Sequence, residues 1–234
     1  MNSIKSENNY WIDYWANKQM SINDDPQKQV ERTVNKVPID QQKWIFTLNE
    51  LERTLILSSG DTLLDLCAGN GMIAMPFALK CRAVTAVDIS EDLLKKIDAD
   101  LYPNVTVIVG DARKVSLPAN KFSKGVMYAA LQYFSEREAI GIFSTIYNSM
   151  KSGGLCLIGD IPDIDHLFDF YSKPDWVAAY FDSVKNGTPA VGTWFKKEIL
   201  VKLAIYTGFS NAEIINQHPH LINSHCRFDL LLTK

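Results

Sequence analysis

The feature that most constrains this 234-residue chain is an alternation of short apolar runs and helical stretches that begins at residue 62. The apolar runs 62–66 and 83–87 are predicted strands, and 71–80 and 90–98 are predicted helices that follow them. Because parallel strands need a crossover connection, this order indicates βαβ units around a sheet covered on both faces. The pattern therefore predicts an α/β domain.

The same alternation continues toward the C-terminus. Further strands and helices are expected at 105–109, 125–129, 135–150, 155–159 and 195–207. The helix at 135–150 should begin with a capping box formed by Ser135 and Glu138. The last two runs, 212–216 and 227–233, predict a hairpin at one sheet edge. We therefore expect a seven-stranded, doubly wound, mostly parallel sheet with an antiparallel C-terminal hairpin strand.

Two segments lie outside this regular pattern. Residues 1–40 are polar and irregular, but they carry aromatic residues at helical spacing (Tyr10, Trp11, Tyr14 and Trp15). We expect an N-terminal helical cap or lid here, ahead of a domain at 41–234 whose first helix spans 41–57; simple packing is the alternative for the aromatic residues. Residues 160–194 are aromatic-rich and irregular, and we expect them to form an insert on the substrate side.

Composition narrows the classes of partner. The net charge is −3, and no run of four basic residues occurs, so a surface that binds nucleic-acid phosphates is disfavoured. Four cysteines without a CxxC pair are typical of reduced thiols. No apolar run approaches 18 residues, and the N-terminus has no secretory signal. We expect a cytoplasmic protein that binds neither membrane nor nucleic acid; oligomeric state is not predicted.

The segment most informative about function is Leu-Leu-Asp-Leu-Cys-Ala-Gly-Asn-Gly at 63–71. A strand that enters a glycine-rich turn and then a helix lets the backbone approach a ligand closely. Asp88 stands 17 residues after Gly71, at the end of the next predicted strand. An acid at that place can accept hydrogen bonds from the two hydroxyls of a ribose. The pattern predicts a cofactor that contains a nucleoside.

A dinucleotide cofactor remains an alternative at this point. The loose dinucleotide-binding pattern G-x-G-x-x-G/A is also satisfied, by Gly69, Gly71 and Ala74. This match alone is a weak signal. Tyr147 and Lys151 have the spacing of short-chain dehydrogenases, but such a pair is expected by chance in a chain with nine tyrosines. A nicotinamide-dependent oxidoreductase is therefore kept as a second function class.

Several weak motifs occur together in one order. They are Asp65–Gly71, Asp88, Gly110–Ala112, Leu131–Phe134, Met150–Gly154 and Thr207–Phe209. In this order the sequence resembles the class I S-adenosylmethionine-dependent methyltransferases over about residues 42–234. Two positions depart from the family pattern: Cys67 replaces the first glycine of its D-x-G-x-G-x-G motif, and Ser123 replaces an aspartate. Neither change removes a required charge.

The resemblance implies the cofactor S-adenosyl-L-methionine, the product S-adenosyl-L-homocysteine and a set of cofactor-binding positions. Asp65 would reach the ammonium group, Asp88 the ribose, and Asp111 the adenine edge. The full set is Asp65, Cys67, Ala68, Gly69, Asn70, Gly71, Asp88, Ile89, Asp111, Ala112, Tyr128, Ala129 and Gln132.

The methyl acceptor should bind outside the carboxyl ends of the strands. That rule selects His218, His220 and Asp160 as candidate catalytic residues, and Tyr14, Tyr133 and His166 as candidate substrate-binding residues. The histidines also fit an exposed or structural role. A zinc site is disfavoured because the H-x-H pair lacks a second close pair of ligands, so no metal is expected.

The sequence therefore predicts methyl transfer to an oxygen or nitrogen atom of a small molecule, such as a sugar, an amine or a natural-product-like metabolite. The chain lacks the Asn-Pro-Pro-Tyr tetrapeptide and the Pro-Cys dipeptide of related enzymes that act on amide, exocyclic amine or cytosine groups. The alternatives are the nicotinamide-dependent oxidoreductase and a non-catalytic module that only binds S-adenosylmethionine.

Overall fold

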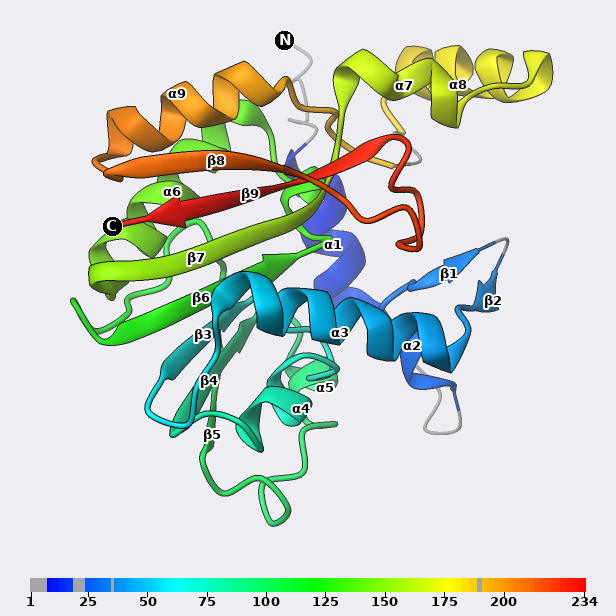
Figure 1. The fold of residues 1–234 in the computed structure, drawn as a ribbon. Coiled ribbons are helices and arrows are strands. Elements are labelled where there is room, and N and C mark those ends of the chain that lie inside the picture. Colours follow the sequence, from blue (N-terminus) through cyan, green and yellow to red (C-terminus); the bar gives the residue numbers. More distant parts are fainter. Residues whose placement is uncertain (1–7, 19–23, 35, 189–190) are drawn as a thin grey trace, which may run out of the picture.

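The computed structural model describes residues 8–18, 24–34, 36–188 and 191–234, and its centre is a seven-stranded sheet (Figure 1). The strand order is β5-β4-β3-β6-β7-β9-β8. The strands are β3 (Thr62–Leu66), β4 (Ala83–Asp88), β5 (Val105–Val109), β6 (Phe122–Tyr128), β7 (Met150–Pro162), β8 (Asn211–Asn216) and β9 (Arg227–Thr233). Strand β9 runs antiparallel to both β7 and β8, whereas β3 to β7 are parallel. The predicted fold class is confirmed.

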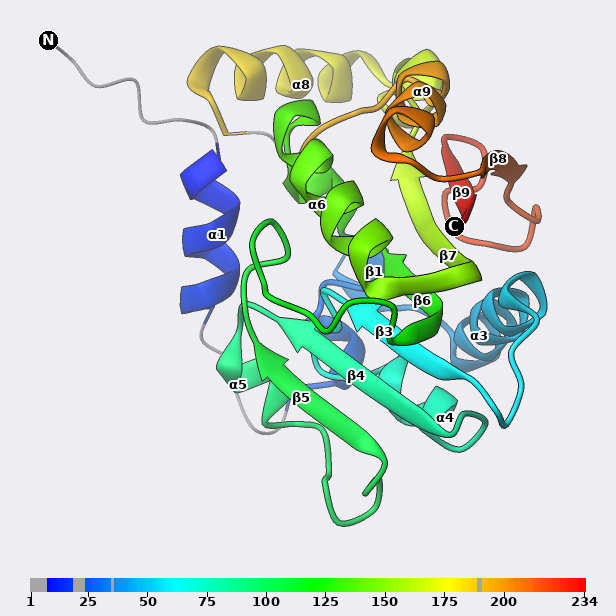
Figure 2. The ribbon, with the colours of Figure 1, turned by 90° about the vertical axis from the view of Figure 1, so that its left-hand side faces the viewer.

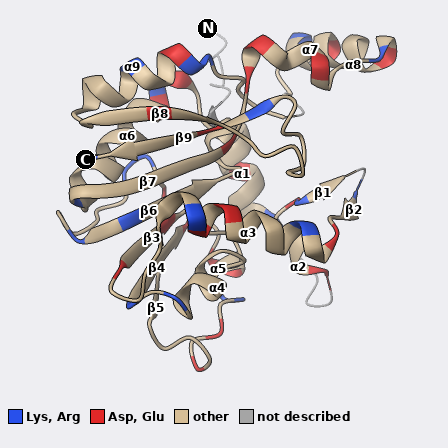
Figure 3. Cartoon of the chain, viewed as in Figure 1, with Lys and Arg blue, Asp and Glu red and all other residues tan. Residues whose placement is uncertain are grey.

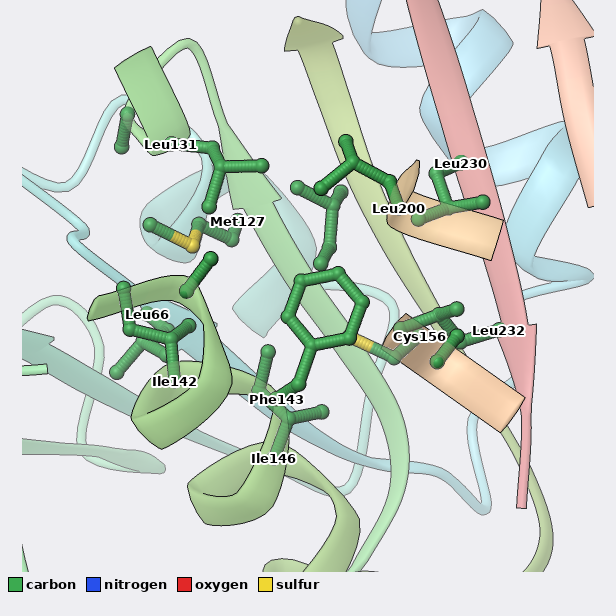
Figure 4. Close-up of a cluster of buried hydrophobic side chains, with 14 of the residues drawn as sticks. Leu66, Met127, Leu131, Ile142, Phe143, Ile146, Cys156, Leu200, Leu230 and Leu232 are labelled. Carbon is green, nitrogen blue, oxygen red and sulfur yellow. The ribbon is translucent and has the colours of Figure 1, made fainter. Parts of the chain in front are cut away.

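Helices cover both faces of this sheet, as Figure 2 shows. One face carries α3 (Gln41–Leu55), α4 (Ala74–Ala78) and α5 (Glu91–Leu94), and the other carries α6 (Glu136–Ser149) and α9 (Lys197–Thr207). Strand side chains alternate between the two layers, so Leu63 packs with α3 and α4 while Leu64 packs with α6 and α9. Figure 4 shows the second layer, where Phe143 of α6 fills the space beside Cys156 of β7.

Local signals place several helix ends. The capping box between Ser135 and Glu138 forms at the start of α6, as expected. Helix α3 begins after the capping side chain of Asp40 and ends at Ile56 in a left-handed conformation, before the Ser-Ser-Gly stop that the sequence suggested. Helix α4 is shorter than predicted because residues 71–73 form turns. Pro76 is its third residue, and the amides on either side of it, those of Met75 and Phe77, bond to the carbonyls of Gly71 and Ile73 in the preceding turn.

The expectation of an irregular segment at 160–194 is wrong. This segment contains the 3-10 turn Ile164–His166, α7 (Leu167–Phe170) and the 13-residue α8 (Pro174–Asn186). Pro174 is the first residue of α8, and Gly187 ends it with a φ of 64°. These are ordinary start and stop signals. They read as loop markers in the sequence, although Val177, Tyr180, Phe181 and Val184 have helical spacing.

The N-terminal region forms α1 (Asn8–Asn17), α2 (Pro26–Gln29) and a small hairpin of β1 (Thr33–Val34) and β2 (Val37–Pro38). Helix α1 stands beside the edge of the sheet where the parallel strands end (Figure 2). The boundary at residue 40 between a cap and a domain stays a prediction. Of the helices that the structure describes, none has the length and apolar character needed to span a membrane.

The packing of Phe143 gives a test of the core. The Phe143 side chain is fully buried, so Phe143→Ala should lower the free energy of unfolding by about 3–5 kcal/mol through lost contacts and a cavity. Ile140, on the same helix, is 43% exposed, and Ile140→Ala should cost below about 1 kcal/mol. Urea unfolding of both variants measures the difference. Equal losses would contradict the assigned core.

Candidate functional site

The main pocket lies at the carboxyl ends of β3, β4 and β6 and encloses about 970 Å³, including its open mouth. Most of the positions predicted to bind a cofactor come together in its wall. They are Asp65, Cys67, Ala68, Gly69, Asn70, Asp88, Ile89, Asp111, Ala112, Tyr128 and Ala129. Tyr133, a predicted substrate-binding residue, lies in the same wall. The role of each residue remains a prediction.

The glycine turn after β3 has a backbone that side chains would disturb. Gly69 and Gly71 have φ values of +56° and +82°. A Cβ atom on Gly69 would stand 2.8 Å from Val30, and one on Gly71 would stand 2.5 Å from Ile97. Both conformation and space therefore require glycine at these positions. Gly71 supports the turn without lining the pocket.

Three residues near the site have a left-handed backbone conformation although they are not glycine. They are Cys67 after β3, Ala129 after β6 and Asp160 in an irregular part of β7, with φ values of 62°, 53° and 59°. Such a conformation costs about 1–2 kcal/mol per residue. The glycine that the methyltransferase family has at the position of Cys67 would adopt this left-handed backbone conformation without strain. Backbone strain of this kind gathers at functional sites.

Asp88 joins the ends of two neighbouring strands. Its Oδ2 accepts a hydrogen bond from the amide of Gly69 at 2.8 Å, and its Oδ1 accepts one from the amide of Ser90 at 2.8 Å. Burial raises the pKa of this carboxyl, and the backbone amides oppose that rise. An ionised carboxylate can accept about four hydrogen bonds, so capacity remains for two hydroxyls of a ribose.

Asp65 is a buried carboxyl without a partner. It is 1% exposed, neither of its oxygens makes a well-aligned hydrogen bond among the described residues, and only the nearby Ala74 amide favours its charged form. Burial, together with the nearby charge of Asp88, raises its pKa to about 8. An isolated buried carboxylate is costly, and a positive group in the pocket would offset that cost. S-adenosylmethionine carries an ammonium and a sulfonium, so the residues present fit this cofactor.

Asp111 is held by a cation from the protein itself. The guanidinium of Arg113 binds both of its carboxylate oxygens and also reaches Glu138. Burial opposes ionisation of Asp111, but the hydrogen bonds from Arg113 outweigh it and hold the pKa below its ordinary value. The Asp111 carboxylate is therefore already paired, which leaves it little capacity for an adenine amino group.

Helix α1 forms one wall of the pocket. Its Trp11 and Trp15 pack on Tyr133, with ring centroids 4.7 and 5.3 Å apart, and both tryptophans line the pocket. Tyr14, the predicted substrate-binding residue of this helix, instead hydrogen-bonds Glu31 and does not line the pocket. The i, i+4 spacing was the right signal, but it leaves open which of the two aromatic pairs faces the pocket.

Arg32 is a pocket residue that the sequence reasoning missed. Its guanidinium lies 4.7 Å from the ring centroid of Tyr128 and 5.1 Å from that of Trp44. It interacts with the Tyr128 hydroxyl and forms no ion pair with a carboxylate of the described residues. Asn70 reaches the same N-terminal segment, because its side-chain amide donates to the Pro26 carbonyl and to Gln29. No motif marks either contact, since each joins distant parts of the chain.

Gln132 and Asp160 lie outside the pocket wall. Both contact Arg227 of β9, which donates to the Gln132 side-chain oxygen and, at 2.8 Å, to the backbone carbonyl of Asp160. The Asp160 amide donates to Asp229 at 2.8 Å. These two residues therefore take part in a buried polar network behind the site, next to the ends of β6 and β7.

The histidines predicted from position are not brought to the pocket. His218 and His220 pack against Phe46 of α3, with ring centroids 4.9 and 5.6 Å away. His166 lies on the surface, 2.6 Å from the Asp169 carboxylate. In the described ranges, no group of three or more histidine, cysteine or acidic side chains is arranged to hold a metal ion.

The tyrosine–lysine pair that suggested a dehydrogenase also lies elsewhere. The Tyr147 ring packs against Phe209, with ring centroids 5.3 Å apart, and beneath the ammonium of Lys234. Neither Tyr147 nor Lys151 lines the main pocket. This pair therefore has no access to a ligand bound there.

Comparison with known proteins agrees with this geometry. Residues 63–154 match a family model described as a methyltransferase domain. A ubiquinone/menaquinone biosynthesis C-methyltransferase of Blochmanniella pennsylvanica is 27% identical over 188 residues, which cover 72% of this chain and 73% of that protein. An S-adenosylmethionine-dependent methyltransferase structure from Clostridium acetobutylicum superposes with a TM-score of 0.64 at 14% identity, over 87% of this chain and 96% of that one.

A third relative matches a shorter part of the chain. It is the "Probable ribosomal RNA small subunit methyltransferase A" of Pyrobaculum islandicum, 31% identical over 77 residues. The match covers 32% of this chain and 33% of that protein. This chain thus spans about a third of the relative's length, whereas it matches most of the C-methyltransferase. The relatives agree on the type of domain and differ in what their names say they act on.

The buried state of Asp65 predicts a pH-dependent stability effect. Its pKa is about 8 in the folded protein against an ordinary value of 3.8, so folding favours the protonated form and stability falls as pH rises through that interval. Asp65→Asn should therefore raise the melting temperature of the ligand-free protein by at least about 2 °C at pH 8, and by less as pH falls toward 4.

Asp61→Asn is the matched control for this measurement. Hydrogen bonds from Ser58 and Ser123 outweigh burial and lower the pKa of Asp61, so its substitution should decrease the melting temperature at pH 8. Thermal unfolding of both variants across this pH interval gives the comparison. A decrease for Asp65→Asn at pH 8 would show that Asp65 has a partner that stabilises its charge.

Proposed function

We propose that this chain, which contains a class I S-adenosylmethionine-dependent methyltransferase domain, transfers a methyl group to an oxygen or nitrogen atom of a small molecule. The cofactor of such a domain is S-adenosylmethionine. The observation that carries the proposal is the buried, unpartnered carboxyl of Asp65 in one pocket with Asp88, at the ends of adjacent strands. That pair of acids suits a ligand with a positive end and a ribose.

The protein's own residues would bind, orient and exclude water. Asp65 would balance the positive charge of the methionine end, and Asp88 would accept the ribose hydroxyls while it holds the Gly69 turn. When bound, the cofactor supplies a methyl group already activated by its sulfonium, so the chain mainly supplies proximity and alignment. Helix α1 would keep water out as a lid, which makes residues 1–40 a functional cap.

A small-molecule acceptor is favoured by the shape and charge of the site. Trp11 and Trp15 of α1 narrow the pocket on one side. In the view of Figure 3, Lys and Arg positions are spread over several helices and strands, together with Asp and Glu positions. The four cysteines are free, which favours a reducing compartment such as the cytoplasm. A sugar, an amine or a natural-product-like metabolite fits this proposal, with 160–194 as its substrate-side insert.

Cofactor choice is the first test. Calorimetric titration of the protein with S-adenosylmethionine, S-adenosylhomocysteine, NADH and NADPH should show micromolar binding of the two sulfur compounds alone. Incubation with S-adenosylmethionine and an acceptor panel should then release S-adenosylhomocysteine. Binding of a nicotinamide nucleotide instead would overturn the proposal, and binding without turnover on any acceptor would favour a non-catalytic module.

The role of Asp88 is tested separately. Asp88→Ala should weaken binding of S-adenosylhomocysteine at least about tenfold, since charge-assisted hydrogen bonds contribute about 1.5–3 kcal/mol. The 2′,3′-dideoxy analogue lacks the ribose hydroxyls, so its affinity should change little between wild type and variant. An equal loss for both ligands would mean that Asp88 acts only by holding the turn at Gly69 and Ser90.

A further inference from the structure

The pocket wall holds one buried hydrogen-bond donor without an acceptor and one guanidinium without a paired carboxylate among the described residues. The indole nitrogen of Trp15 is buried, and no partner for it exists among the described residues. The guanidinium of Arg32 lies over the rings of Tyr128 and Trp44 and interacts with the Tyr128 hydroxyl, but it forms no ion pair with a carboxylate of the described residues. A buried donor without an acceptor is costly, and a guanidinium offers five N–H donors. Both side chains therefore suit a ligand atom that accepts hydrogen bonds.

The two donors belong to the same part of the pocket. Trp15 packs on Tyr133, with ring centroids 5.3 Å apart. Arg32, Trp15 and Tyr133 all line the main pocket. Burial and the charge of Glu31 raise the pKa of Tyr133 to about 12, whereas Gln132 and the positive charges of Arg227 and Arg32 oppose that rise. One ligand can meet both donors beside Tyr133.

The surface around these donors is aromatic and apolar. Trp11, Ile12, Trp44 and Phe134 line the same pocket. Its carboxyl groups are those of Asp65, Asp88 and Asp111, which lie at the ends of β3, β4 and β5, and Asp111 is already paired with Arg113. On the side of α1, the described wall therefore offers flat apolar contact and donors. Its ligand should be planar and should present an oxygen that only accepts.

We propose that the methyl acceptor is an aromatic oxyanion, a planar ring with a carboxylate or phenolate oxygen that Arg32 and the Trp15 indole hold beside Tyr133. This inference rests on the proposed methyltransferase function and names its substrate class. Arg32 supplies charge, the tryptophans supply ring contact, and the indole N–H fixes the position of the oxygen.

The same geometry removes the need for a general base when the acceptor atom is a phenolate. A nearby guanidinium favours the ionised form of a phenol. The phenolate oxygen then forms the new bond to the methyl carbon while the carbon–sulfur bond breaks and sulfur keeps the electron pair, so no proton is transferred. This accounts for His218 and His220 lying away from the pocket.

The test uses the full chain saturated with S-adenosylhomocysteine and three probes: benzoate, benzamide and cyclohexanecarboxylate. Benzamide keeps the ring without the charge, and cyclohexanecarboxylate keeps the charge without the flat ring. Calorimetry should show benzoate binding at least about tenfold tighter than either of the others. Equal affinities for the three probes, or no saturable benzoate binding, would overturn the proposal.

Two variants assign the donors. Arg32→Gln should abolish the preference for benzoate over benzamide, and Trp15→Phe should weaken benzoate binding while it keeps the ring contact. Arg53→Gln and Trp176→Phe change the same residue types at sites outside the main pocket and should leave benzoate affinity unchanged. Unchanged benzoate binding in both Arg32→Gln and Trp15→Phe would contradict the assignment.

The cofactor itself is the other possible source of a carboxylate for Arg32. If Arg32 holds the acceptor, Arg32→Gln should change the affinity for S-adenosylhomocysteine by less than about threefold. A loss of tenfold or more that is absent for 5′-methylthioadenosine, which lacks the carboxylate, would assign Arg32 to the cofactor and overturn the proposal. Failure of the wild type to bind S-adenosylhomocysteine would instead refute the underlying methyltransferase function.

Discussion

The hydrogen bonds of Asp88 to the amides of Gly69 and Ser90 hold the site together. They connect the turn after β3 to the turn after β4, because the buried carboxylate of Asp88 binds an amide in each turn. Because Gly69 is fixed in this way, the neighbouring strand end presents Asp65 to the same pocket. This connection between adjacent strands accounts for two acids, Asp65 and Asp88, in one pocket wall.

The pocket also contains features that lower the stability of the ligand-free protein. Asp65 is a buried acid without a hydrogen-bond partner, and the left-handed residues Cys67 and Ala129 stand at the ends of β3 and β6. Each feature is unfavourable in the ligand-free protein, and the well-packed layer around Phe143 offsets it. A cationic ligand would relieve the largest of these costs, which couples ligand binding to stability.

The N-terminal region completes the pocket although it precedes the parallel sheet in sequence. Asn70 of the glycine turn binds the Pro26 carbonyl and Gln29, and Val30 lies against Gly69. The turn therefore positions α2 and, with it, the Arg32 side chain. Helix α1 then closes the pocket through the contact of Trp11 and Trp15 with Tyr133. One side of the pocket thus comes from the sheet and the other from α1, Val30 and Arg32.

The sequence by itself determined the elements whose signals are local. Strand β3 has its predicted bounds, the capping box at Ser135 forms, and the turn at Gly69 and Gly71 has the conformation that only glycine adopts readily. It also indicated a mostly parallel sheet with an antiparallel hairpin at one edge, because strands that alternate with helices form βαβ units. The helix α8 was missed although Val177, Tyr180, Phe181 and Val184 have helical spacing, because its proline and glycine read as loop signals and not as its start and stop.

Only the tertiary structure decided which side chains share the pocket. The i, i+4 pattern of α1 is the same for Tyr10 and Tyr14 as for Trp11 and Trp15, and packing on Tyr133 selects the tryptophans. Arg32 carries no motif, and its place over Tyr128 depends on a contact between segments far apart in the chain. His218 and His220 follow β8 as expected, but they pack against Phe46 of α3 and do not line the pocket. Periodicity and capping act over a few residues, whereas the site is assembled by long-range packing.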